Sequence, residues 1–235
     1  MQFQTPLIRA TLVRRYKRFL ADIILPDGRE VVAHCANPGA MTGLNMPGAT
    51  IWVEPNDDPK RKLRFSWKLV EIGTDWACID TALPNELVAE ALAQRQIPEL
   101  AIFDTLKREV KYGENSRIDF LLNTGGLNTY VEVKAVSLKR DGWAEFPDSV
   151  TKRGTKHLNE LAEMVVQGHR SVMVYLVQRT DCIRFRLAAD IDPSYAAAFT
   201  RASDDGVEML CLATEISPYG MLVAGLLPID PPQQK

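Results

Sequence analysis

Two neighbouring strand-like segments carry acidic residues that would approach each other if the segments paired. Residues 117–122 and 130–135 are rich in β-branched and aromatic side chains, and the Asn, Thr and Gly residues between 123 and 128 favour a turn. We therefore expect an antiparallel hairpin. Because side chains alternate between the faces of a strand, Glu132 and Lys134 must share one face. Pairing across the hairpin can bring Asp119 close to Glu132.

Two carboxylates and an ammonium group on one sheet face admit two interpretations. A hard divalent cation such as Mg²⁺ or Mn²⁺ prefers oxygen ligands, is held by one or two carboxylates, and lowers the pKa of a bound water. The alternative is a cross-strand salt bridge on an exposed face, which contributes about 0.2–1 kcal/mol to stability. Bulky residues such as Ile118, Phe120, Val131 and Val133 indicate a buried opposite face. This flanking pattern favours the metal site.

The first part of the chain has the pattern of a small all-β domain. Short strand-like runs alternate with turns such as Pro26-Asp27-Gly28, which is a hairpin signal. The runs are residues 7–13, 19–25, 30–34, 50–54, 63–72 and 76–80. Short strands at this density favour a small closed barrel. We predict an OB-like β-barrel over residues 1–83.

The pattern changes at Pro84. Apolar residues at helical spacing predict one helix over residues 85–94 and a second over 155–166, with Thr155 as its N-cap. A polar, aromatic loop is expected between the hairpin and the second helix. Residues 171–177 form a nearly continuous apolar run, which is typical of a buried central strand. Later elements are expected as a strand at 183–187, a helix at 192–202 and a strand at 207–216. We predict an α/β domain over residues 84–235.

Basic residues are unevenly distributed although the net charge is only -2. Residues 1–70 carry more basic than acidic side chains, and two basic clusters stand near Tyr16, Phe19 and Trp67. Barrels of the OB type bind nucleic acid through charge and aromatic stacking. The alternative for each cluster is an ordinary solubilising loop. We expect phosphate contacts from Arg14, Arg15, Lys17, Arg18, Lys60, Arg61 and Lys62.

A third group of polar residues stands at the start of the second helix. His157 and Glu160 are three residues apart and so face the same side of the helix. With Arg153 and Lys156, His157 could hold a phosphate near the metal. A solvated helix end is the alternative.

Cysteine usage and hydropathy bear on the compartment. The four cysteines are widely spaced without a Cys-x-x-Cys pair, which favours buried free thiols over disulfides or a zinc site. The N-terminal residues have no signal-peptide pattern, and no run of about 18 apolar residues could span a bilayer. We expect a protein of the reducing cytoplasm without a membrane partner.

The order helix, Asp119 strand, Glu132-Val133-Lys134 strand, helix, strand resembles the core of the PD-(D/E)xK nuclease superfamily. The resemblance implies an αβββαβ unit with a mixed sheet flanked by helices, in which Asp119 and Glu132 hold Mg²⁺ (or Mn²⁺) and Lys134 assists the attacking water. The proline that often precedes the aspartate is absent. Superfamily members often recruit an acidic residue from the first helix, which implies Glu86 as a further metal ligand. The alternative for Glu86 is an acid that stabilises the helix dipole.

A second resemblance covers nearly the whole chain. The segments His34-Cys35-Ala36-Asn37-Pro38-Gly39-Ala40-Met41, Ser116 to Leu122, Val131 to Lys134 and Arg153 to Leu158 resemble the sugar fermentation stimulation protein A family. This resemblance implies an N-terminal OB-type domain, a nuclease-like C-terminal domain, DNA binding and a regulatory link to maltose metabolism.

Two functional hypotheses follow. The first is a Mg²⁺-dependent phosphodiesterase that acts on DNA, with RNA as an alternative substrate. The second is a non-catalytic, non-specific DNA-binding regulator of maltose metabolism genes that retains a nuclease fold. The oligomeric state stays open, and a homodimer is one option.

Overall fold

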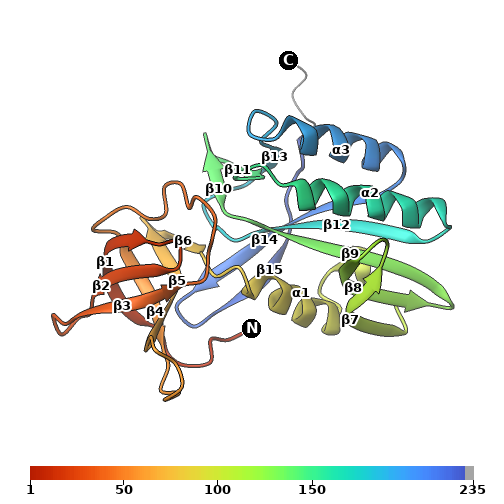
Figure 1. Cartoon of the computed structure of the whole chain (residues 1–235). Coiled ribbons are helices and arrows are strands. Elements are labelled where there is room, and N and C mark those ends of the chain that lie inside the picture. Colours follow the sequence, from red (N-terminus) through yellow and green to blue (C-terminus); the bar gives the residue numbers. More distant parts are fainter. Residues whose placement is uncertain (231–235) are drawn as a thin grey trace.

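Five strands close into a barrel in the N-terminal part of the chain (Figure 1). The structure is a computed structural model and describes residues 1–230. The barrel strands are β1 (Ile8–Tyr16), β2 (Leu20–Ile24), β3 (Glu30–Cys35), β4 (Thr50–Pro55) and β5 (Phe65–Ile72). They follow the order β3-β2-β1-β4-β5, and parallel pairing of β3 with β5 closes the barrel. Alternate residues such as Ile23 and Trp67 fill its interior. The predicted small closed barrel is confirmed.

A sixth strand links the barrel to the second domain. β6 (Asp75–Cys78) pairs with β5, and its Cys78 amide donates to the carbonyl of Gln178, 2.9 Å away. The Thr180 amide in turn donates to the carbonyl of Trp76 at 2.9 Å. At the chain start, the Met1 ammonium group donates to the Met221 carbonyl at 2.7 Å. The barrel is therefore fixed to the second domain by backbone hydrogen bonds.

The second domain is built on a six-stranded mixed sheet. Its order is β15-β14-β12-β9-β8-β7, with β12 parallel to both β9 and β14 and the other neighbours antiparallel. These strands are β7 (Thr105–Tyr112), β8 (Ser116–Thr124), β9 (Leu127–Val136), β12 (Arg170–Val177), β14 (Glu208–Ser217) and β15 (Gly220–Leu226). β12 is buried along almost its whole length, as its continuous apolar run predicts.

Three α-helices cover the two faces of this sheet. α2 (Lys152–Val166) and α3 (Pro193–Asp204) lie side by side on one face, and α1 (Leu83–Ala93) lies on the other (Figure 1). Leu158, Leu161 and Met164 form the buried stripe of α2, and Lys156 and Glu163 lie on its exposed side. A short 3₁₀ turn, Pro98–Leu100, follows α1. The predicted mixed sheet flanked by helices is confirmed.

Two details of the hairpin region differ from the sequence expectation. The turn is only two residues, Gly125 and Gly126, because Thr124 still pairs with Leu127. Both glycines have positive φ, which is the backbone that a two-residue hairpin turn needs. The expected polar loop after the hairpin contains β10 (Leu138–Arg140) and β11 (Trp143–Phe146), which join β13 (Phe185–Leu187) in a small separate sheet.

The N-cap of α2 is Thr151 and not Thr155. The Thr151 hydroxyl accepts a hydrogen bond from the Gly154 amide at 3.1 Å, so α2 begins one turn earlier than predicted. Both threonines precede a helical pattern, but Gly154 packs closely against Tyr195 and lies inside the helix. The close packing of Gly154 against α3 explains why a glycine is tolerated there.

The four cysteines are buried free thiols, as predicted. Among residues 1–230 no helix is long and apolar enough to cross a membrane.

The capping geometry of α2 gives a stability prediction. Thr151→Ala should lower the free energy of unfolding by about 1 kcal/mol, because it removes the acceptor for an amide at the helix start. Thr155→Ala is the matched control, since Thr155 donates only a long 3.4 Å hydrogen bond to the Thr151 carbonyl. Denaturant titration of both variants measures the difference. A larger loss of stability for Thr155→Ala would contradict the assigned cap.

Candidate functional site

The hairpin strands β8 and β9 separate at the acidic residues. Their register runs from Thr124 opposite Leu127 to Phe120 opposite Val131, and Asp119 and Glu132 lie just past its end. The Val133 amide, which has no β8 carbonyl to bond, donates to Asp119 Oδ2 at 2.7 Å. The Asp119 carboxylate thus replaces a backbone acceptor at the point where the strands diverge. The backbone pairing of β8 with β9 therefore ends at the two acidic residues.

Asp119 is held from its other side by α1. Asn85, in the first turn of α1, donates from Nδ2 to Asp119 Oδ1 at 2.6 Å. Burial and the negative charge of Glu132 raise the pKa of Asp119 to about 6, and the hydrogen bonds from Val133 and Asn85 act in the opposite direction. A carboxylate with this raised pKa would gain from a nearby cation.

Glu132 lies at the centre of the cluster. Its Oε1 accepts from Lys134 Nζ at 2.7 Å and also contacts His157 Nδ1, and the side chains of Glu132 and Lys134 are 4% and 13% exposed. Burial by itself would raise the pKa of Glu132, but the hydrogen bond from His157 and the charge of Lys134 hold it below its usual range. Glu132 Oε2 is buried and has no hydrogen-bond partner. The predicted sharing of one face by Glu132 and Lys134 is visible in their direct contact.

The start of α2 completes the cluster. His157 is buried, and its ring bonds Glu132 through Nδ1, contacts Lys134 Nζ at 3.1 Å and accepts from Arg153 Nε at 3.2 Å on its other nitrogen. Its partners are therefore the carboxylate cluster and Arg153, whereas sequence reasoning assigned it to phosphate contact.

A buried carboxylate clamps the β7–β8 turn to α2. Glu160 Oε1 accepts from the Glu114 amide at 3.2 Å, and Lys156 Nζ donates to the Glu114 carbonyl at 2.6 Å. A Cβ on Gly113 would lie 2.7 Å from Glu160 Oε1, so this close approach requires glycine. Glu160 Oε2 and the Tyr112 hydroxyl are both buried without a partner. The charges of Glu132, Glu160 and Asp119, after burial, raise the pKa of Tyr112.

The site chemistry fits a divalent cation. Glu132 Oε2 is a buried anionic oxygen without a partner, and the neighbouring Asp119 has a pKa raised by burial and by Glu132. Within residues 1–230 no cluster of three or more Asp, Glu, His or Cys side chains forms a ready metal site. Mg²⁺ needs only one or two carboxylates because it retains several waters. Asp119 and Glu132 are the residues that would hold it.

Glu86 forms its ion pair with Arg108 and not with a member of this cluster. Its carboxylate binds the Arg108 guanidinium of β7 at 2.7 and 3.0 Å, and its side chain is 55% exposed. The hydrogen bond from Arg108 lowers the pKa of Glu86. The α1 residue that contacts Asp119 is Asn85. Both Asn85 and Glu86 lie near the start of α1, and the sequence prediction chose Glu86 because it is the acidic one.

The basic residues of the barrel fall into two sets. Arg14 pairs with Asp22 at 2.7 Å, and Arg15 donates to the carbonyls of Asn37 and Gly39 at 2.7 and 3.1 Å. Within residues 1–230 an exposed second set makes no ion pair: Lys17, Arg18, Lys60, Arg61 and Lys62. The side chains of this second set are free to neutralise an external anion.

The Asn37-Pro38-Gly39 segment of the barrel lies against the second domain. Within the barrel domain, Asn37 Nδ2 donates to the Ile79 carbonyl at 3.0 Å, and Asn37 Oδ1 accepts from the Gly39 backbone amide at 2.8 Å. Gly39 approaches the second domain so closely that a Cβ there would lie 2.5 Å from Asp148 Oδ2. Through its hydrogen bonds to the Asn37 and Gly39 carbonyls, Arg15 therefore fixes the segment that meets the second domain.

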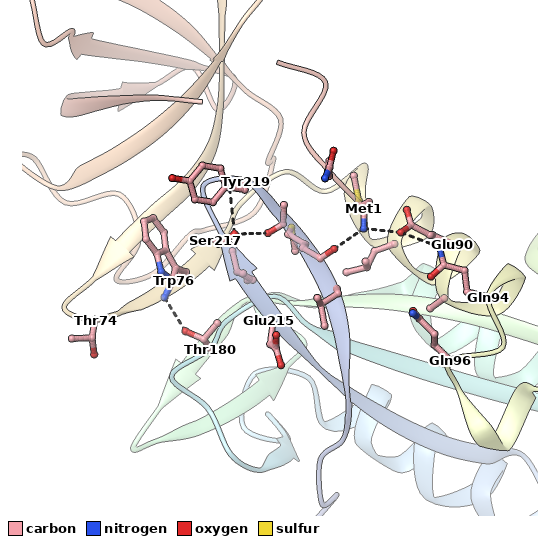
Figure 2. A pocket seen from close by; sticks show the side chains of 17 residues that line it. Met1, Thr74, Trp76, Glu90, Gln94, Gln96, Thr180, Glu215, Ser217 and Tyr219 are labelled. Carbon is pink, nitrogen blue, oxygen red and sulfur yellow. Dashed lines mark hydrogen bonds and ion pairs between the residues drawn. The ribbon is translucent and has the colours of Figure 1, made fainter. Parts of the chain in front are cut away.

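A hollow of about 980 Å³ lies between β6, α1 and β15, away from the carboxylate cluster. Figure 2 shows Trp76, Glu215 and Tyr219 at its wall, with the Met1 ammonium bonded to Glu90. Asp119, Glu132 and Lys134 do not line it, and its lining contains no Lys or Arg. This hollow therefore lacks the chemistry of a phosphate site.

The raised pKa of Asp119 gives a pH prediction for the metal-free protein. The Asp119 carboxyl should titrate near pH 6, and Glu132→Gln should lower its pKa because a neighbouring negative charge is removed. The folded chain holds this proton at pH values where an unfolded aspartate has released it, so Asp119 ionisation lowers stability as pH rises from 3.8 towards 6. Carbon-detected NMR titration measures the pKa. Glu86→Gln is the control and should leave it unchanged; an ordinary Asp119 pKa in wild type would contradict this assignment.

Comparison with known proteins places these features in a family. The family model described as the SfsA N-terminal OB domain matches residues 13–79, and that described as the sugar fermentation stimulation protein RE domain matches residues 82–220. The sugar fermentation stimulation protein homolog from Dinoroseobacter shibae is 61% identical, and the match covers 100% of this chain and 98% of that protein. The homolog from Roseobacter denitrificans is 60% identical, over 97% of this chain and 99% of that protein.

A solved structure agrees over both domains. SfsA from Pyrococcus furiosus in complex with Ca²⁺ is 26% identical, with a TM-score of 0.86 over 98% of each chain. The OB-type barrel and the α/β domain thus occur together in a relative. The chain belongs to the sugar fermentation stimulation protein family.

Proposed function

We propose that the chain is a Mg²⁺- or Mn²⁺-dependent nuclease that hydrolyses phosphodiester bonds in DNA. The observation that carries the proposal is the buried, unpartnered Glu132 Oε2 beside Asp119, at the point where β8 and β9 separate. An isolated buried anionic oxygen is costly unless a cation or a donor satisfies it. A surface salt bridge, the alternative from sequence, would not leave a carboxylate oxygen buried in this way.

Each residue of the cluster has a role that its contacts support. Asp119, fixed by Val133 and Asn85, and Glu132, through Oε2, would hold the cation. The cation supplies charge stabilisation for a phosphoryl group and a more acidic water. Lys134 orients the attacking water or balances the negative charge that develops on phosphate. His157 holds Glu132 and Lys134 in place from α2.

The Pyrococcus relative supports the cation assignment. That protein was solved in complex with Ca²⁺, which is a hard, oxygen-seeking cation like Mg²⁺. The donor set of Asp119 and Glu132 is all oxygen, in agreement with a preference for hard cations. The shared fold over both domains supports the same cation preference in this chain.

The barrel supplies the proposed DNA contact. At the β1–β2 turn, Lys17 and Arg18 have φ of 47° and 63°, a left-handed backbone that disfavours residues other than glycine and asparagine. Glycine would form this turn without strain, so the two exposed basic side chains carry a local conformational cost. The exposed Lys60 to Lys62 loop adds further positive charge. These groups would contact the phosphate backbone without reading sequence.

Catalysis is tested on supercoiled plasmid, single-stranded DNA and RNA with Mg²⁺ or Mn²⁺. Wild type should cleave DNA, and Lys134→Ala should lower the rate by about 10²–10⁴-fold if Lys134 takes part in proton transfer. Asp119→Ala should abolish metal-dependent cleavage. Glu163→Gln, on the exposed side of α2, is the control and should retain the wild-type rate. Equal cleavage by wild type and Asp119→Ala would identify a contaminant and overturn the proposal.

The barrel contact is tested by salt dependence. Lys17→Ala with Arg18→Ala should weaken DNA binding and reduce the slope of log K against log salt by about 0.9 for each phosphate that the variant no longer neutralises. Arg201→Ala, an exposed residue on α3, serves as the control for a general charge effect. Fluorescence anisotropy at several salt concentrations gives the slopes. An unchanged slope in the double variant would remove the β1–β2 turn from the DNA interface.

One observation favours the second hypothesis, a DNA-binding regulator without turnover. Lys134 donates to Glu132 Oε1 at 2.7 Å and its Nζ lies 3.1 Å from His157 Nδ1, so the ammonium group proposed to act on water is already engaged by the carboxylate. Undiminished DNA binding by Asp119→Ala, with no cleavage by wild type on any substrate, would support this function. The relatives' name links the family to sugar fermentation, which agrees with a regulatory role in sugar metabolism.

A further inference from the structure

The side chain that α1 contributes to the cluster is neutral. Asn85 donates to Asp119 Oδ1 at 2.6 Å, while the adjacent Glu86 is turned to Arg108 and is 55% exposed. Among residues 1–230 no third carboxylate joins Asp119 and Glu132 in a metal-binding group. The Asn85 side-chain amide therefore occupies the position on α1 from which an acidic residue would reach Asp119.

An acid could not replace Asn85 without a further compensating charge. An ionised carboxylate only accepts hydrogen bonds, so Asn85 must present its NH₂ group to Asp119. A carboxylate at this 2.6 Å contact would face another carboxylate, and two such groups cannot both ionise unless a proton or a cation lies between them. The amide instead fixes Asp119 and leaves its charge available.

The carboxylate oxygens of Asp119 and Glu132 that remain free to bind a metal suffice for one cation. Glu132 Oε1 is engaged by Lys134 and His157, which leaves Glu132 Oε2 as its buried free oxygen. Asp119 keeps unused lone pairs, since each of its oxygens accepts one hydrogen bond from Asn85 or Val133. Two carboxylates balance one divalent cation. A two-metal site needs ligands for ions about 3.5–4 Å apart, and a second ion here would add two positive charges beside Lys134.

We propose that Asn85 is a positioning residue that holds Asp119 for the cation, and that the site takes one divalent cation per chain and not two. This inference rests on the proposed function of the site as a cation centre. Asn85 acts through Asp119, in the way that residues behind metal ligands commonly fix ligand geometry. Glu86 has no part in the centre.

The stoichiometry is measured on the full-length wild-type chain with Mn²⁺ alone. Isothermal titration, with free Mn²⁺ counted by electron paramagnetic resonance, should give one bound ion per chain. Two bound ions that are both absent in Asp119→Ala would overturn the one-cation inference but leave the proposed function intact. No bound ion in wild type would overturn the proposed function itself, and this inference with it.

The role of Asn85 is measured by affinity. Asn85→Ala should weaken Mn²⁺ binding by about 10–100-fold, the usual effect of removing a residue that supports a metal ligand. The rise in melting temperature caused by Mn²⁺ should shrink accordingly, while the melting temperature without metal shows that the variant is folded. Asn159→Ala, the same change on the exposed side of α2, is the control.

Two results would remove Asn85 from the centre. One is an Asn85→Ala affinity within twofold of wild type, and the other is a tenfold weaker affinity in Glu86→Gln, which would restore Glu86 as the helix contribution. If Asn85→Ala does not fold, Asn85→Ser keeps a small donor at the same place, and its affinity should be weaker than that of wild type. An Asn85→Ser affinity equal to wild type would then show that the amide contact to Asp119 is dispensable.

Discussion

The separation of β8 from β9 beyond Phe120 and Val131 is the constraint on which the candidate site depends. While the strands are paired, their backbone groups satisfy one another and no acid is needed. Where they part, the Val133 amide requires another acceptor, and Asp119 supplies it. Glu132, at the same break, is buried against His157 of α2. One local break in hydrogen bonding therefore positions both acids, and helices on opposite sheet faces then fix them.

The cluster is arranged at a cost to the metal-free fold. Burial and Glu132 raise the pKa of Asp119, and Glu132, Glu160 and Tyr112 each leave a buried polar atom without a partner. Buried polar groups are normally paired, so several exceptions in one place indicate a functional site or a missing ligand. The surrounding structure is stable enough to hold them, because β12 and the α2 stripe bury extensive apolar surface.

Strand periodicity made the hairpin and the shared face of Glu132 and Lys134 predictable, and the turn-rich N-terminal pattern made the barrel predictable. β7 was not predicted because it is an edge strand with exposed charged residues such as Lys107 and Lys111. These charges oppose edge-to-edge pairing with another chain, and they obscure the alternation of apolar and polar residues that marks a strand. Asn85, rather than Glu86, could not be chosen from sequence. Both lie in the first turn of α1, and only the rotation of that helix against β8 decides which one reaches Asp119. The roles of His157 and Asn37 likewise depend on contacts between distant segments.

The central claim is that Asp119 and Glu132 together hold a divalent cation. A crystal of the full-length chain grown with Mn²⁺ tests it directly, because manganese gives an anomalous difference signal. We expect one strong peak bonded to both Asp119 and Glu132 Oε2, with Asn85 still hydrogen-bonded to Asp119. A cluster that stays free of Mn²⁺ at saturating concentration, with Lys134 and His157 still closed on Glu132, would contradict the claim.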